Sequence, residues 1–355
     1  MNSKNTTLDF SGQPIYIGLD VHKKSWKATI CTAHSVQRAF IIENPFVNNL
    51  VKHLHCRFAN GDYYCVYEAG FSGFWAQEQL SAKGIKTIVV NPADIPTTDK
   101  ERQFKDDKRD SRKLSLSLRS GELQGIYVPD KEAQKDRSTV RARAQIASKQ
   151  RRVKNQIKST LHFYGIEIPE DFSNRHWSRR FVSWLEQVCE QKSLDGLRML
   201  LDIHLTLRDH QLKATRKLRE ISRQNKYAKL SQLLRSVPGV GLLTQMLLLT
   251  EIVDINRFKT EDQLFAYTGL IPRTNSSGET QRTGEMTKRG NKRLKSALIE
   301  SAWVAIRKDP QLLVKYETYR KRMGGHKAIV RVARILLRKI RSVWRNEQNY
   351  LITEF

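Results

Sequence analysis

Short apolar runs rich in β-forming residues dominate the first 90 residues, and their order constrains the fold more than any other feature of the chain. Such runs occur at residues 15–21, 26–32, 38–42, 63–68 and 85–90. A helical pattern at 73–83 separates the last two runs, and another begins near Asp107. Three strands followed by strand, helix, strand and helix predict an α/β unit in which helices flank a mixed sheet.

Four acidic residues lie at or near the ends of these elements. Asp20 is in the C-terminal part of the first run, Glu68 ends the fourth, and Asp107 and Asp110 share one face at the start of the last helix. Converging carboxylates repel one another unless cations neutralise them, and hard oxygen ligands suit Mg²⁺ or Mn²⁺. The pattern therefore predicts a divalent-metal site that acts on phosphates. For each residue the alternative is an ordinary helix cap or surface acid, and Asp106 is a rival to Asp107.

The order of strands and helices matches an RNase H-like sheet. Actin-like sugar kinases use the same sheet, but they place a Gly/Thr phosphate loop after the acidic residue of the first strand. Here Val21-His22-Lys23-Lys24 follows instead. The sequence therefore disfavours the kinase interpretation.

A strong positive charge points to a polyanionic partner. The chain has 63 Lys and Arg against 36 Asp and Glu, a formal net charge of +27. The excess is concentrated in two tracts, 135–158 and 281–345, which favours nucleic-acid contacts over a merely solvated basic surface. The expected contact residues are Arg151, Arg152, Lys154, Lys158, Arg273, Arg282, Lys288, Arg289, Lys292, Arg293 and Lys295.

Other features limit the cellular setting. Cys31, Cys56, Cys65 and Cys189 show no CxxC spacing, so we expect reduced thiols and no zinc site. The polar N-terminal segment lacks the apolar core of a signal peptide, and no apolar run is long enough to span a membrane. We therefore expect a cytoplasmic protein without a membrane partner.

The rest of the chain is expected to be mainly helical. Apolar residues recur at helical spacing through 130–235 and predict two or more long helices, either a coiled-coil arm or helices packed on the body. The expected organisation is an α/β domain at 13–128, a helical arm at 129–235, a mainly helical domain at 236–345 and a tail at 346–355.

Two segments of the C-terminal domain suggest chemistry. Pro238-Gly239-Val240-Gly241 lies between helical patterns and is typical of a helix-hairpin-helix, whose Gly239 and Gly241 would let backbone amides approach a DNA phosphate. A tight helix–helix turn is the alternative. A polar loop is expected at 273–285, where a serine beside Arg and Lys could attack a phosphodiester, although most Ser-Ser-Gly triplets are turns.

Together these segments resemble the transposases of insertion-sequence family 110, including its 1111-type subgroup, and the related Piv-type DNA invertases. The matching segments are IGLDVHK (17–23), VYEAG (66–70), DDKRDSRKL (106–114), SVPGVG (236–241), FAYTGLIPRTNSSGE (265–279) and MTKRGNKRLKSALIESAW (286–303). The resemblance implies a RuvC-like domain with a DEDD tetrad and a C-terminal transposase domain with a nucleophilic serine.

Carried over by position, the tetrad is Asp20, Glu68, Asp107 and Asp110, and the serine is Ser277, with Ser276 as a rival. The chain departs from the family pattern in two places. Asp106 stands where Thr is common, which leaves the choice between Asp106 and Asp107 open, and Gly70 stands where Thr or Ser is common.

The resemblance further implies a mechanism and partners. The serine would become covalently linked to DNA before strand exchange, and the tetrad and serine would come from different protomers of a dimer or tetramer. A structured noncoding bridge RNA would pair with donor and target DNA, and a bacterial, nucleoid-associated setting is expected. The alternatives are a RuvC-like Holliday-junction endonuclease without serine chemistry and a basic nucleic-acid-binding protein with a degenerate site.

Overall fold

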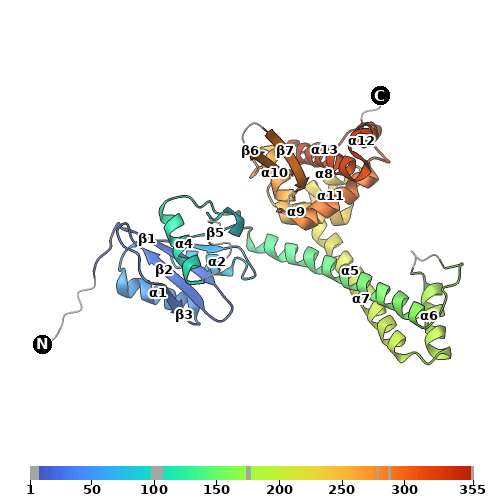
Figure 1. Ribbon diagram of the computed structural model, residues 1–355, viewed down its shortest axis with the longest axis horizontal. Helices are drawn as coiled ribbons and strands as arrows, with labels where there is room; N and C mark the ends of the chain where they lie inside the picture. Colours follow the sequence, from blue (N-terminus) through green and yellow to red (C-terminus); the bar gives the residue numbers. More distant parts are fainter. Residues whose placement is uncertain (1–7, 97–106, 173–176, 278–279, 287–288, 353–355) are drawn as a thin grey trace. The chain divides into compact units, whose positions relative to one another are not determined.

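A computed structural model describes residues 8–96, 107–172, 177–277, 280–286 and 289–352, and the side chains of 107–109 and 273–286 lie outside this description. The chain divides into two compact units, Met1–Val128 and Pro129–Phe355 (Figure 1). In the described residues, no helix combines the length and apolar character needed to cross a bilayer.

The N-terminal unit contains a mixed sheet of five strands, as the sequence predicts. Its strands are β1 (Pro14–Val21), β2 (Trp26–Cys31), β3 (Phe40–Ile42), β4 (Asp62–Glu68) and β5 (Lys86–Val90). Their order in the sheet is β3-β2-β1-β4-β5. The pairs β1/β2 and β2/β3 are antiparallel, whereas β1/β4 and β4/β5 are parallel. The carboxyl ends of β1 and β4 therefore lie at the same edge of the sheet.

Helices cover both faces of this sheet. The elements are α1 (Phe46–Arg57), α2 (Trp75–Ser81), the short 3₁₀ helix η1 (Pro92–Asp94) and α4 (Asp107–Arg119). Ile15, Ile17 and Leu19 of β1 join one apolar core with Leu50 of α1 and Leu80 of α2, and α4 covers the opposite face. Helix α1 was not predicted from the sequence, because its three buried apolar side chains are spread among Asn, Lys and His.

The second unit begins with an antiparallel pair of long helices, α5 (Lys131–Phe163) and α7 (Asp195–Ser222), which lie side by side (Figure 1). Helix α6 (Arg179–Gln191) packs against their far ends through an apolar core that includes Ile157, Leu185 and Leu201. The side chain of Asp130 caps α5 by accepting a hydrogen bond from the Ala133 amide at 2.7 Å. The long helices expected in this region are confirmed.

The remaining helices form a separate apolar core with one end of the long pair. They are α8 (Asn225–Arg235), α9 (Leu242–Ile252), α10 (Glu261–Thr268), α11 (Lys292–Ala305), α12 (Pro310–Met323) and α13 (Gly325–Asn346). Helix α9 lies in the centre of this core, since eight of its residues, Gln245–Ile252, are buried.

The prediction of a polar loop at 273–285 is wrong. Strands β6 (Pro272–Ser277) and β7 (Thr280–Met286) form a two-stranded antiparallel hairpin. The polarity of the segment suggested a loop, but Thr274, Thr280 and Thr283 are β-branched, and such residues favour strands. Ser276 and Ser277 of the Ser-Ser-Gly triplet end β6, and Gly278 lies outside the described residues.

Candidate active site

Helix α4 lies unusually close to β1, and Gly18 makes that approach possible. A Cβ atom on Gly18 would lie 2.1 Å from the Ser111 carbonyl oxygen and 2.5 Å from the Ser115 amide nitrogen. Both are backbone atoms, so no rotamer change of a neighbour could make room. Thr29, which pairs with Gly18 on β2, has its Oγ1 2.9 Å from the Ser111 Oγ. These contacts attach α4 to both β1 and β2.

The side-chain contacts also give the direction of α4. Ser111 lies at the level of the pair Gly18 and Thr29, whereas the Ser115 Oγ is 3.0 Å from the Sγ of Cys31, which pairs with Tyr16. Since residue numbers rise along α4 as they fall along β1, the helix runs opposite to the strand. The N-terminal end of α4 therefore lies toward the carboxyl ends of β1 and β4.

Asp20 and Glu68 occupy neighbouring positions at that edge. The parallel register pairs Leu19 with Tyr67, so Asp20 and Glu68 are the next residues on the two strands. Side chains alternate between the two faces of a strand, and Gly18, two residues before Asp20, faces α4. Asp20 and Glu68 therefore lie on the face that α4 covers. The Asp20 side chain is 19% exposed, and Glu68 is exposed.

The other two predicted ligands belong to the first turn of α4. Asp107 is the first residue of the helix, and its side chain lies outside the described part of the structure. Asp110 is exposed, and Asp106 lies outside the described residues. Among the side chains that the structure does describe, no three His, Cys, Asp or Glu residues gather as a metal-binding set. Four carboxylates at one edge would supply the hard oxygen donors that Mg²⁺ or Mn²⁺ prefers.

His22, which was not predicted from the sequence as a site residue, is a neighbour of this edge. Its Nε2 lies 2.9 Å from the Asp20 Oδ2, and the histidine side chain is 47% exposed. The spacing of two residues in extended backbone places both side chains on one face, and this is the signal that could have found the pair.

The hairpin of β6 and β7, called here the serine hairpin because β6 ends with Ser276 and Ser277, is closed at its base by backbone contacts. Gly269 precedes the hairpin and Gly290 follows it, and a Cβ on Gly290 would lie only 2.6 Å from the Gly269 amide nitrogen. The Asn291 amide donates to the Tyr267 carbonyl oxygen at 2.8 Å. Ser277 pairs with Thr280 at the end of β6, and the side chains of Ser276 and Ser277 lie outside the description.

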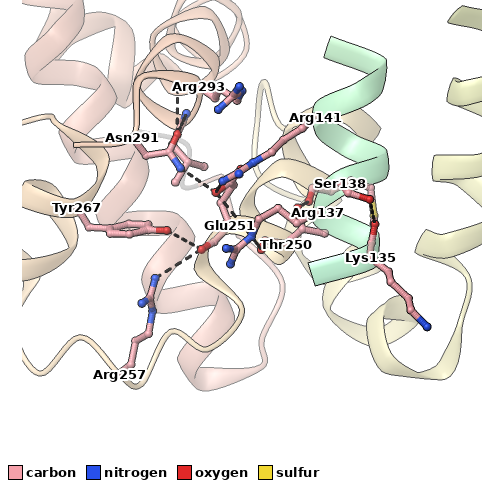
Figure 2. Close-up of polar contacts among 12 residues, drawn as sticks. Lys135, Arg137, Ser138, Arg141, Thr250, Glu251, Arg257, Tyr267, Asn291 and Arg293 are labelled. Atoms are coloured by element: carbon pink, nitrogen blue, oxygen red, sulfur yellow. Dashed lines mark hydrogen bonds and ion pairs between the residues drawn. The ribbon is translucent and has the colours of Figure 1, made fainter. Parts of the chain in front are cut away.

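A buried carboxylate, Glu251 of α9, connects this base to the long helix α5 (Figure 2). Its oxygens accept two hydrogen bonds of 2.8 Å from Arg141 of α5 and one of 2.9 Å from the Asn291 Nδ2. Its carbonyl oxygen accepts from the Tyr267 hydroxyl at 2.7 Å. Arg137 lies 3.8 Å away and donates to the neighbouring Thr250 carbonyl oxygen. Glu251 thereby contacts Tyr267, which precedes the hairpin in the chain, and Asn291, which follows it.

Two opposing effects act on the pKa of Glu251. Burial raises the pKa, because only 1% of the side chain is exposed. Hydrogen bonding to Arg141 and the charges of Arg141 and Arg137 lower it, and the net pKa is below its ordinary value. Asn291 uses its other side-chain atom, Oδ1, to cap α11 through the Arg293 and Leu294 amides.

The two glycines predicted to contact DNA, Gly239 and Gly241, have different surroundings. A Cβ on Gly239, which has a φ of +81°, would lie 2.1 Å from the Ser301 carbonyl oxygen of α11. This close packing against α11 explains why a glycine is needed at position 239. It is what a tight helix–helix turn, the alternative to a DNA-binding hairpin, requires. Gly241 is exposed at the N-cap of α9, with open space around its missing Cβ.

The predicted basic contacts lie mainly on two helices of the second unit. Those on α5 are Arg151 and Arg152, which are exposed, and Lys154 and Lys158, which are half-buried. At the start of α11, Arg289, Lys292 and Arg293 are exposed and Lys295 is half-buried. Lys154 Nζ lies 5.1 Å from the Trp177 ring centre. The side chains of Arg273 and Arg282, and residue Lys288, lie outside the description.

Two family models match separate parts of this chain. A DEDD transposase model of the IS110 group matches residues 17–166, which include the sheet edge with the predicted tetrad. The model described as transposase IS116/IS110/IS902 family matches residues 231–317, which include the hairpin. The chain belongs to the IS116/IS110/IS902 family of transposases. Transposases cut and rejoin DNA, so this family member is a DNA-acting enzyme.

Curated relatives of this family member are transposases from several bacteria. The putative transposase y4qE of Sinorhizobium fredii is 28% identical and aligns over 81% of this chain and 71% of its own length. The transposase for insertion sequence element IS1533 of Leptospira borgpetersenii is 26% identical, over 68% and 70%. The transposase for IS1111A of Coxiella burnetii is 24% identical, over 63% and 60%. The chain is therefore a transposase of an insertion sequence.

Proposed function

We propose that this transposase cleaves DNA at a divalent-metal site made by Asp20, Glu68, Asp107 and Asp110 in a RuvC-like fold, with Ser277 as the nucleophile. The observation that supports the metal site most directly is the shared sheet edge. Asp20 and Glu68 are adjacent there on the face that α4 covers, and the N-terminal end of α4 lies toward them. Carboxylates gathered in this way need a cation, and bound Mg²⁺ would offset the charge of the scissile phosphate.

The serine step conserves the number of phosphodiester bonds. The Ser277 oxygen forms a bond to phosphorus as its proton leaves, and the ester bond to one DNA oxygen breaks, so that this oxygen ends as a hydroxyl. Attack by another strand's hydroxyl reverses the step and restores Ser277. The basic residues of α5 and the start of α11 would hold the nucleic-acid backbone, and the turn with Gly241 would act as a helix-hairpin-helix.

Ser277 and the carboxylates belong to different compact units of the chain. We propose that they meet within a dimer or tetramer in which the long helices contact a second copy. Exposed Met199, Ile203 and Leu212 on α7 support a contact along this helix.

The metal and serine roles are tested together on supercoiled plasmid carrying the ends of the element, in the presence of Mg²⁺. Asp20→Asn should lower strand cleavage by about a hundredfold or more, because one cation ligand loses its charge. Asp62→Asn is the matched control, since Asp62 begins β4 at the opposite edge of the sheet. Unchanged cleavage by Asp20→Asn would exclude this metal site.

In the same assay Ser277→Ala should abolish both cleavage and the covalent protein–DNA adduct seen on a denaturing gel. A RuvC-like Holliday-junction endonuclease would instead keep cleaving without an adduct. Nucleic-acid binding should survive Asp20→Asn, because phosphate contacts come mainly from Lys and Arg.

We also propose that a structured noncoding bridge RNA guides the enzyme to donor and target DNA, as the family resemblance implies. The net charge of +27 supports a large polyanionic partner. Purifying the protein from its source and sequencing the nucleic acid that copurifies should yield one dominant RNA encoded beside the gene. Recovery of unrelated RNAs in proportion to their abundance would contradict guidance.

A further inference from the structure

A cavity of about 510 Å³ lies where the end of α7, the length of α8 and the start of α9 meet. Among its lining residues, Gly241 is the one that was predicted from the sequence as a contact residue. Its polar lining comes mainly from Arg219, Arg223, Arg235, Ser231 and Gln245. None of the lining residues in the described part of the chain is acidic. The cavity is therefore suited to an anion.

The three arginines of this cavity come from two helix ends. Arg219 and Arg223 lie at the end of α7, and Arg235 is the last residue of α8. All three are exposed, and none forms an ion pair with the residues that the structure describes. Their charges are thus available to a ligand, and an arginine fork matches the geometry of a phosphate group.

The start of α9 adds backbone donors. Gly241 is the N-cap, no side chain caps the helix, and its first turn has no acidic residue. The first intrahelical hydrogen bond runs from the Gln245 amide to the Gly241 carbonyl oxygen at 2.9 Å. The amides of residues 242–244 precede that bond and have no partner within the helix. A helix start of this kind favours a bound anion.

Gln245 supplies an independent observation that points to a ligand in this cavity. The side chain lines the cavity and is only 2% exposed. Its Oε1 accepts a hydrogen bond from the Ser231 Oγ at 2.9 Å, whereas its Nε2 has no hydrogen-bond partner among the described residues. A buried donor without a partner is unfavourable, and a ligand oxygen in the cavity would satisfy it.

We propose that this cavity binds a backbone phosphate of a nucleic acid. The three arginines would neutralise the phosphodiester, and Gln245 Nε2 and the α9 amides would donate to its oxygens. The inference rests on the proposed function in taking a nucleic acid as the ligand and in using the start of α9, where Gly241 belongs to the proposed helix-hairpin-helix. The predicted carboxylate site belongs to the other compact unit, so the two proposals can fail separately.

Binding of a short fluorescein-labelled DNA duplex and of an RNA hairpin, measured by anisotropy across a salt series, tests the proposal. Gln245→Glu keeps the acceptor for Ser231 but replaces the Nε2 donor with a carboxylate oxygen. This variant and the double variant Arg219→Ala/Arg223→Ala should bind about tenfold more weakly. For duplex DNA, the salt slope of the double variant should fall by about 0.9 for each phosphate that the protein no longer neutralises.

Arg216→Ala is the matched control, because Arg216 is exposed on α7 but does not line the cavity. Its affinity should change less than about twofold, as expected for a charge without a specific phosphate contact. Weakening confined to the duplex identifies DNA as the source of the phosphate, and weakening confined to the hairpin identifies RNA. Cavity variants that bind both probes as Arg216→Ala does would overturn the proposal.

A second measurement uses the unaltered protein and so does not depend on the folding of a variant. Phenylglyoxal modifies accessible arginines, and mass spectrometry locates the modified residues. Bound nucleic acid should protect Arg219, Arg223 and Arg235 while Arg216 stays reactive. Equal modification of all four arginines with and without nucleic acid would exclude a phosphate in this cavity. Neither measurement depends on strand cleavage, and Asp20→Asn protein should give the same protection.

Discussion

Replacing Gly18 with alanine is expected to lower the free energy of unfolding of the N-terminal unit by about 3 kcal/mol. The added Cβ would lie 2.1 Å from the Ser111 carbonyl oxygen and 2.5 Å from the Ser115 amide, so α4 as a whole must move away from β1. That movement breaks the contacts of Ser111 with Thr29 and of Ser115 with Cys31. Urea unfolding of the whole protein, monitored by hydrogen exchange of the α4 amides, measures this loss of stability.

Gly70→Ala is the matched control for Gly18→Ala. Gly70 lies just beyond the end of β4, and a Cβ there would approach only the Glu68 carbonyl oxygen, at an ordinary distance of 4.0 Å. Its stability should therefore change little. If Gly18→Ala unfolds at the same urea concentration as Gly70→Ala, α4 does not dock on β1 as described. Displacement of α4 should also lower plasmid cleavage, because two of the four proposed ligands belong to its first turn.

Replacing Glu251 with leucine is expected to destabilise the second unit by about 3 kcal/mol. The change leaves Arg137, which is 12% exposed, and Arg141 without their carboxylate partner. It also removes the acceptor for the Asn291 Nδ2, which holds the base of the serine hairpin (Figure 2). Adduct formation by Ser277 should therefore fall even under conditions where the second unit stays folded.

A double-mutant cycle isolates the ion pair from packing. Glu251→Leu combined with Arg141→Met removes both charged partners, so its destabilisation should be smaller than the sum of the two single changes by about 2 kcal/mol. Purely additive losses would show that the charge of Glu251 contributes nothing through Arg141.

The pH dependence of stability provides a further check on the same carboxylate. Because the folded-state pKa of Glu251 is below its ordinary value of 4.5, its contribution to stability is complete above that pH and is lost as the pH falls through the folded-state pKa. Acid unfolding of Glu251→Gln should lack this component. An identical acid transition in the two proteins would contradict the lowered pKa.

Much of the N-terminal α/β unit could be predicted from the sequence. The strands that end near Asp20 and Glu68 could be predicted because strand formation depends on local properties of the sequence. These are runs of β-forming residues, and polar or proline residues that end each run. Helix α4 was likewise expected near Asp107 from its helical pattern. Helix α1 and the hairpin were missed or assigned to a loop, because their polar side chains give a weak periodic signal.

Local pattern determined which elements form and which acidic residues lie at their ends. Only the tertiary structure decided the direction of α4 over Gly18, the proximity of His22 to Asp20, and the burial of Glu251 against Tyr267 and Asn291, which flank the hairpin. These features depend on contacts between residues far apart in the chain, such as Thr29 with Ser111. No local propensity encodes such contacts, because they exist only once the elements have packed together.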